Sequence, residues 1–241
     1  MNTKPFVIFG TARTGSTLLR SLLNAHPAIH CDGELLNPTF WTRVTCPRLL
    51  YRIWYRYPHV YITLRRFAAR LRYHRPIYGF KLFERHVYEP GQVLGSLNAT
   101  GWRIIYLWRR SVFDRTLSVL VGAATNHWIS MADSAVPILS IDISQTEFMQ
   151  TVAFVHAQQV RCAALMRETS HLEIVYEDDL RQSESWQPLL DRICAFLEIP
   201  PSLAVSPVHQ TWRRPYREFV SNYAELVEAF QQSHFVDTSE R

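Results

Sequence analysis

The chain has few lysines and one long stretch without acidic residues. Of its 26 basic residues only Lys4 and Lys81 are lysines, and no Asp or Glu lies between Leu35 and Phe83. No uninterrupted apolar run reaches the ~20 residues that a membrane-spanning helix needs. The four cysteines are scattered without a C-x-x-C pair, so the spacing indicates neither a zinc site nor a disulfide framework.

What is present is typical of a globular α/β protein. A chain of 241 residues with 47% hydrophobic residues can bury a substantial core, and we expect one domain spanning residues 1–241. The net charge of +5 favours anionic ligands. The first predicted strand begins at Phe6, which leaves no room for a signal peptide, so we expect a cytoplasmic protein.

The N-terminal segment combines a strand, a loop with two glycines and a helix. The apolar run Phe6–Phe9 precedes a loop, and leucines then recur at helical spacing up to His26-Pro27. Against the phosphate-binding pattern G-x-x-x-x-G-K-[ST], the residues Gly10, Gly15 and Thr17 match, but Ser16 replaces the lysine. This predicts an anion cradle that does not bind an ordinary triphosphate and that depends on Arg13 for positive charge.

Residues 13–18 (RTGSTL) resemble the 5′-phosphosulfate loop of sulfotransferases that use 3′-phosphoadenosine 5′-phosphosulfate (PAPS), and the similarity continues through 24–27 (NAHP) to 31–34 (CDGE). The segment is similar to protein-tyrosine sulfotransferases and to bacterial glycolipid and nodulation-factor sulfotransferases. The resemblance implies a three-layer α/β fold like that of P-loop NTPases, with a mostly parallel central sheet. It also implies that the loop residues bind the sulfuryl donor; these are Arg13, Thr14, Gly15, Ser16, Thr17 and Leu18.

The resemblance also implies catalytic residues. A glutamate at the position of Glu34 is the general base in the related groups, and a lysine after a strand comparable to Ile77–Phe83 assists the leaving group, which points to Lys81. Arg13 and the loop amides would stabilise the negative charge that develops. His26 and His30 remain rival candidates for the base.

Two further strands are predicted, at Arg103–Trp108 and Leu172–Tyr176. In the family, an arginine at a strand end and a serine eight residues later hold the 3′-phosphate. Arg110 and Ser118 have this spacing, although Arg109 stands beside Arg110 and the sequence leaves open which of the two contacts phosphate.

Two other functions remain open from the sequence. The acidic residues Glu177 and Asp178 follow a strand as metal ligands do in P-loop kinases that use ATP and Mg²⁺. The Arg-rich stretch 43–75, with a predicted basic helix at Pro58–Tyr73, is typical of a non-catalytic module that binds nucleic acid or anionic lipid.

For the sulfotransferase interpretation we expect no metal, because a terminal sulfuryl group carries less charge than a phosphoryl group, and no nucleic acid partner. We expect a glycan or glycolipid acceptor, while a small-molecule alcohol or phenol and a tyrosyl peptide stay open, and we expect contact of the stretch 43–75 with the acceptor or a membrane surface. Residues 213–223, which contain several arginines, resemble the C-terminal segment of bacterial sulfotransferases.

Overall fold

A parallel β-sheet forms the centre of the molecule. The computed structural model describes residues 4–37, 53, 55–126, 130–131, 140–206, 208–209 and 215–235. Within these residues, five strands pair in the order β2-β3-β1-β4-β6, and every pairing between neighbours is parallel. The strands of this sheet are β1 (Phe6–Gly10), β2 (Ile29–Glu34), β3 (Ile77–Phe83), β4 (Arg103–Trp108) and β6 (His171–Val175). Two short strands, β5 (Ser130–Met131) and β7 (Val208–His209), form a separate antiparallel pair.

The sheet confirms the predicted mostly parallel arrangement and corrects it in two places. The strand β2, at the edge of the sheet beside β3, was not predicted, because only Ile29 and Cys31 of its residues are apolar and buried. The predicted strand Leu172–Tyr176 is shifted by one residue, since Tyr176 begins a single π-helical turn, η2 (Tyr176–Leu180). Isolated π turns of this kind occur frequently at functional sites.

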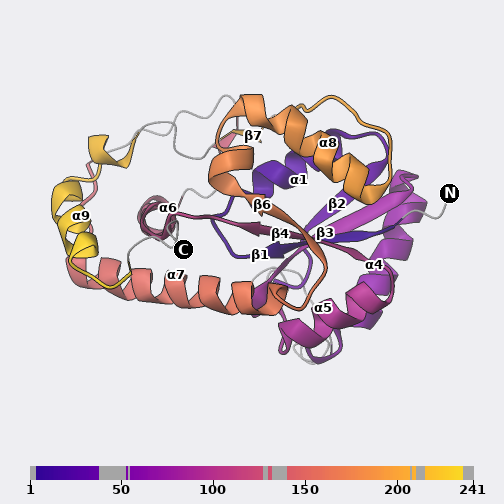
Figure 1. Ribbon diagram of the computed structural model, residues 1–241, viewed down its shortest axis with the longest axis horizontal. Helices are drawn as coiled ribbons and strands as arrows, with labels where there is room; N and C mark the ends of the chain where they lie inside the picture. Colours follow the sequence, from indigo (N-terminus) through magenta and orange to yellow (C-terminus); the bar gives the residue numbers. More distant parts are fainter. Residues whose placement is uncertain are drawn as a thin grey trace.

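Helices cover both faces of the sheet, which confirms the three-layer architecture (Figure 1). Leucines of α1 and α8 pack against one face, and apolar residues of α4, α5 and the C-terminal half of α7 pack against the other. Alternate residues of β1 serve the two cores, because Phe6 and Ile8 belong to the first cluster and Val7 and Phe9 to the second. The helices are α1 (Ser16–Ala25), α4 (Pro58–Tyr73), α5 (Pro90–Ala99), α6 (Val112–Thr125), α7 (Gln145–Met166), α8 (Trp186–Leu197) and α9 (Tyr223–Gln231).

A third apolar cluster lies beyond the carboxyl end of β4, where α6, the N-terminal half of α7 and α9 pack together (Figure 1). Its aromatic centre is Phe113, which makes edge-on contacts with Phe148, Tyr223 and Phe230. This cluster fixes α6 where the loop after β4 meets the loop after β1. The short 3₁₀ turn η4 (Tyr216–Glu218) precedes α9 and lies against the same cluster.

Some predictions fall wholly or partly outside the described residues. Of the stretch 43–75, the structure describes residue 53 and residues 55–75, and there the predicted basic helix is confirmed as α4. Arg213 and Arg214 of the C-terminal segment also lie outside the described residues. Within the described part of the chain, no helix is both long and apolar enough to cross a bilayer.

Candidate active site

The loop between β1 and α1 is shaped by two glycines. A Cβ at Gly10 would lie 2.2 Å from the carbonyl oxygen of Leu107, so only glycine lets β1 approach β4 so closely. Gly15, the N-cap of α1, has φ +86° and lies under the ring of Tyr176, which a Cβ would meet at 2.7 Å. Arg13 adopts φ +67°, which is uncommon for a non-glycine residue and is often found at functional sites.

Hydrogen bonds hold the loop in this conformation. The hydroxyl of Thr14 donates to the carbonyl of Thr11 over 2.8 Å, and Nε of Arg115 donates to the carbonyl of Ala12 over 3.0 Å. Arg115 is buried, and burial lowers its pKa to about 10. It is anchored on α7 by Gln158 Oε1 (2.7 Å) and the carbonyl of Val155 (3.3 Å). Arg115 on α6 therefore holds the loop against α7, a role that no sequence pattern indicated.

One side of the loop is lined by arginines and hydroxyl groups. Nε of Arg13 donates to Ser118 Oγ on α6 over 2.9 Å, so two residues predicted for the donor site are in contact. The hydroxyl of Tyr216 hydrogen-bonds the same serine, and burial raises the pKa of that tyrosine. Burial lowers the pKa of Arg13, and the positive charge of Arg109 lowers it further. The residues Arg13, Arg109, Ser118 and Tyr216 thus converge at the start of α1; we call them the arginine side.

Arg109 and Arg110 point to different partners. The guanidinium of Arg110 forms a two-pronged ion pair with Asp178 at 2.6 and 3.2 Å. The guanidinium of Arg109 lies 4.7 Å from the ring centre of Tyr176, beneath which Gly15 lies. Among the described residues, Nε of Arg109 is buried without a hydrogen-bond partner, but the guanidinium forms ion pairs with carboxylate oxygens of Glu177 and Asp114, each at 3.4 Å. Of the adjacent pair, Arg109 is therefore the one that lies over Tyr176 and whose charge lowers the pKa of Arg13.

The acidic residues after β6 are occupied by other contacts. Glu177 accepts hydrogen bonds from the backbone amides of Arg110 (2.8 Å) and Ser111 (3.2 Å) at the start of α6. Asp178 pairs with Arg110, and Asp179 accepts from the amide of Val175 over 2.9 Å. These contacts give the acidic segment a structural role in joining β6 to α6. They argue against the interpretation of Glu177 and Asp178 as metal ligands.

The other side of the loop contains the predicted catalytic pair. In the register of the sheet Glu34 lies opposite Lys81, after an irregularity in β2 that follows Cys31. Nζ of Lys81 lies 3.3 Å from Glu34 Oε1 and 3.4 Å from the hydroxyls of both Ser16 and Thr17. Its side chain is 3% exposed, whereas that of Glu34 is 32% exposed. We call Glu34, Lys81, Ser16 and Thr17 the lysine side.

Burial sets the protonation of the groups around Glu34. It lowers the pKa of Lys81, and the negative charge of Glu34 opposes this effect. His86 lies behind the pair, with Nε2 3.9 Å from Glu34 Oε2, and its Nδ1 accepts from the backbone amide of Phe83 over 3.3 Å. Burial lowers the pKa of His86 to about 4, so this ring is neutral near pH 7. Asn37 donates to Glu34 Oε2 over 2.5 Å and helps to orient the carboxylate.

The rival histidines are engaged elsewhere. His26 Nε2 lies 3.0 Å from the carbonyl of Pro200, and its Nδ1 accepts from the amide of Ala28 over 3.1 Å. His30 Nε2 lies 3.1 Å from a carboxylate oxygen of Asp32, and its ring stacks on Tyr73 at 3.8 Å. Both imidazoles therefore have structural contacts, which favours Glu34 as the base.

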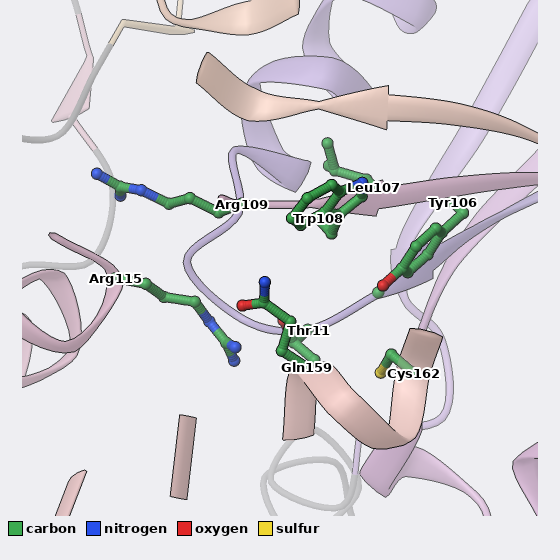
Figure 2. A pocket seen from close by; sticks show the side chains of 9 residues that line it. Thr11, Tyr106, Leu107, Trp108, Arg109, Arg115, Gln159 and Cys162 are labelled. Carbon is green, nitrogen blue, oxygen red and sulfur yellow. The ribbon is translucent and has the colours of Figure 1, made fainter. Parts of the chain in front are cut away.

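A small hollow of about 10 Å³, room for about one water molecule, adjoins the loop between the ends of β1 and β4 and helix α7 (Figure 2). It is far smaller than the ~300 Å³ at the lower end of small-molecule sites, so it is too small for a nucleotide. Gln159 Oε1 is buried there without a hydrogen-bond partner among the described residues. The lining residues are Gly10, Thr11, Tyr106, Leu107, Trp108, Arg109, Arg115, Gln159 and Cys162.

Comparisons with known proteins find similarity to sulfotransferases. Residues 5–77 match the model of the Sulfotransferase family, a segment that contains the loop and Glu34. The sulfotransferase domain of the Synechococcus PCC 7002 olefin synthase superposes with a TM-score of 0.51 at 16% identity, covering 95% of this chain and 87% of that one. A sulfotransferase from Alicyclobacillus acidocaldarius gives a TM-score of 0.47 at 15% identity, covering 96% and 94%. A search of curated proteins gave no significant match.

These findings confirm the resemblance to sulfotransferases that the sequence predicted, and they support a sulfotransferase enzyme. The structural likeness, at 16% identity, shows the fold. The match over residues 5–77 carries the resemblance into the part of the chain where the loop, Ser16, Thr17 and Glu34 lie.

Proposed function

We propose that this protein transfers a sulfuryl group from PAPS to a hydroxyl group of an acceptor that is a glycan or a glycolipid. The observation that carries the proposal is the division of the loop into two sides. Arginines and hydroxyls gather on one side, and a paired carboxylate and lysine gather on the other. An anion held at the start of α1 would lie between them.

The arginine side fits a donor that carries two phosphate groups. The loop amides and Arg13 would hold the 5′-phosphate, while Ser118 and Arg109 would hold the 3′-phosphate. Nε of Arg109 makes no hydrogen bond within the protein, and its guanidinium lies 3.4 Å from carboxylate oxygens of Glu177 and Asp114, so a 3′-phosphate would supply the hydrogen-bond acceptor that these longer ion pairs do not. Arg110 was the arginine assigned from spacing, and it stays a candidate, although its guanidinium contacts Asp178.

The lysine side supplies the acid–base chemistry. The carboxylate of Glu34 accepts the proton of the acceptor hydroxyl as that oxygen attacks sulfur, so that a new S–O bond forms. The S–O bond to the 5′-phosphate breaks, and adenosine 3′,5′-bisphosphate leaves with an additional negative charge on its phosphate. Lys81, beside the hydroxyls of Ser16 and Thr17, stabilises that charge together with the loop amides and Arg13.

The acceptor assignment rests on the resemblance to bacterial glycolipid and nodulation-factor sulfotransferases. The side chain of Glu34 is partly exposed at the edge strand of the sheet, where a hydroxyl of a large acceptor can reach it. The kinase alternative receives less support, since Glu177 and Asp178 are bound to backbone amides and an arginine.

Ligand-induced stabilisation tests the proposal. Adenosine 3′,5′-bisphosphate should raise the melting temperature, because a ligand at a hundredfold excess over its Kd stabilises the native state by ~2.7 kcal/mol. ATP with Mg²⁺ and an oligonucleotide should have little effect. Adenosine 5′-phosphate serves as the matched control that lacks the 3′-phosphate. A larger shift with ATP and Mg²⁺ would favour a kinase, and a shift with the oligonucleotide alone would favour a nucleic-acid-binding module.

A further inference from the structure

Helix α4 carries an exposed apolar stripe on the side that faces away from the sheet. Its opposite side, with Pro58, Ile62 and Ala69, is buried. The stripe residues recur at intervals of three and four, so they lie on one side of the helix. They are Tyr57 at the N-cap (61% exposed), Val60 (60%), Leu64 (58%), Phe67 (64%) and Leu71 (61%).

Arginines flank this stripe, and no acidic residue offsets them within the helix. Arg70 and Arg72 are exposed near its C-terminal end, and Arg56 lies exposed just before its start, 3.9 Å from a carboxylate oxygen of Glu89. Arg66 is half-buried with its guanidinium 5.7 Å from the ring centre of Trp102. The exposed side of α4 therefore combines a continuous apolar strip with positive charge along its borders.

This combination distinguishes α4 from ordinary surface. Single exposed apolar residues are normal, but a contiguous set with a polar border marks an interaction site. A second copy of the chain is a poor partner, because two such faces would bring arginines against arginines. Helices that lie in a membrane interface have an apolar face bordered by Lys and Arg, whose long stems reach up to the lipid phosphates.

We propose that the exposed face of α4 docks this protein on a bilayer surface that carries anionic lipids. The apolar stripe enters the boundary between headgroups and acyl chains, while the flanking arginines contact lipid phosphates. Exposed aromatic residues at the N-terminal end of the face, Tyr57 and Tyr88, suit the headgroup level. Arg56 links them, with its guanidinium 5.7 and 5.1 Å from the two ring centres.

Docking through α4 would hold one edge of the sheet at the membrane. In the chain, the helix lies between β2, which ends at Glu34, and β3, which carries Lys81. A hydroxyl on a lipid-linked acceptor would then be presented near the edge strand. The docking itself depends only on the surface of α4, so the vesicle experiments test it independently of the sulfuryl-transfer proposal.

Flotation with vesicles of phosphatidylcholine, with or without about one third phosphatidylglycerol, tests the docking surface. We expect the full chain to bind the anionic vesicles and to bind neutral vesicles much less. The double variant Leu64→Ser/Phe67→Ser should weaken binding at least about ten-fold. The matched control Val160→Ser/Leu203→Ser changes two other exposed apolar residues and should bind like the unmodified protein.

A second pair of variants tests the charge. Arg70→Glu should weaken binding about five-fold or more, whereas Arg167→Glu, the same change at an exposed arginine after α7, should have little effect. Unchanged melting temperatures and circular dichroism would show that all variants fold.

Three outcomes would overturn the docking proposal. The first is that the unmodified protein does not bind anionic vesicles. The second is that it binds but the α4 variants bind equally well. The third is that the protein does not bind vesicles but is a dimer, as measured by light scattering, and that Leu64→Ser/Phe67→Ser converts it to a monomer. The stripe would then be a contact between two copies of the chain.

Discussion

The two sides of the loop at the start of α1 differ in how they are built. The arginine side joins residues from distant parts of the chain, since Arg13, Ser118 and Tyr216 come from the loop, from α6 and from the turn before α9. On the lysine side, Glu34 and Lys81 come from two neighbouring strands in register, and they meet the first residues of α1.

The difference indicates that the arginine side binds the donor and the lysine side carries out the chemistry. Three of the four residues of the arginine side are cationic or phenolic groups on long side chains, which suits recognition of a charged nucleotide. A buried lysine beside a partly exposed carboxylate, with a neutral histidine behind them, suits proton transfer and stabilisation of a leaving group. Changes on the lysine side should therefore affect turnover, and changes on the arginine side should affect donor affinity.

The largest effect is expected for Glu34→Gln. The amide keeps the shape of the side chain but cannot accept the proton, so turnover should fall by ~10²–10⁴. The affinity for adenosine 3′,5′-bisphosphate should stay within a few-fold of that of the unmodified enzyme, as measured by calorimetry. Glu184→Gln, the same change at an exposed carboxylate, is the control. Near-normal turnover in Glu34→Gln, with loss of activity in a folded His26→Ala or His30→Ala variant, would assign the base to histidine.

The second largest loss of turnover is expected for Lys81→Met, which removes the ammonium group that stabilises the leaving phosphate. Turnover should fall by ~10²–10³, the usual effect of losing one such donor. Burial lowers the pKa of Lys81, so its ammonium group loses its proton at a lower pH than an exposed lysine does. The activity of the unmodified enzyme should therefore decline at a lower pH than it would with an exposed lysine in this role. Lys81→Met should lack this alkaline decline. Lys4→Met, at the other lysine of the chain, should leave the pH profile unchanged.

Donor affinity should respond most to Arg13→Ala. Loss of a charge-assisted hydrogen bond of ~1.5–3 kcal/mol predicts that adenosine 3′,5′-bisphosphate binds roughly ten to a hundred times more weakly. Turnover at saturating donor should fall much less than in Glu34→Gln. If Arg13→Ala changed turnover alone and left the Kd intact, the division between the two sides would be wrong.

The smallest effect separates the two adjacent arginines. Arg109→Ala should weaken adenosine 3′,5′-bisphosphate about ten-fold more than adenosine 5′-phosphate, because only the first ligand has a 3′-phosphate. Arg110→Ala, which breaks the surface pair with Asp178, should affect both ligands little. The reverse result, a selective loss in Arg110→Ala only, would return the 3′-phosphate to the residue expected from spacing.

Local patterns predicted the segment from Phe6 onward, the resemblance to sulfotransferases supplied Lys81 and Ser118, and contacts that depend on tertiary packing alone were missed. Strand, loop and helix from Phe6 onward are readable because the glycine spacing and the leucine periodicity are local. The strand β2 was missed because its second half, Asp32-Gly33-Glu34, is polar and only pairing with β3 makes it a strand.

The same reasoning explains the residues around the loop that were missed. Arg115 braces the loop only because α6 folds back over it, and His86 reaches Glu34 only through the 3₁₀ turn after β3. Tyr216 reaches Ser118 across about a hundred residues of sequence, and no local pattern could have indicated that contact. The choice between Arg109 and Arg110 likewise depends on where Asp178 lies.

The most direct measurement is transfer of a radiolabelled sulfuryl group from PAPS to hydroxyl-bearing components of a cell extract, followed for the unmodified enzyme and for Glu34→Gln. The proposed function predicts a labelled glycan or glycolipid and a matching release of adenosine 3′,5′-bisphosphate, with both products reduced at least a hundredfold in Glu34→Gln. Label that stays in PAPS while the enzyme binds the bisphosphate tightly, or equal transfer by both proteins, would contradict the account.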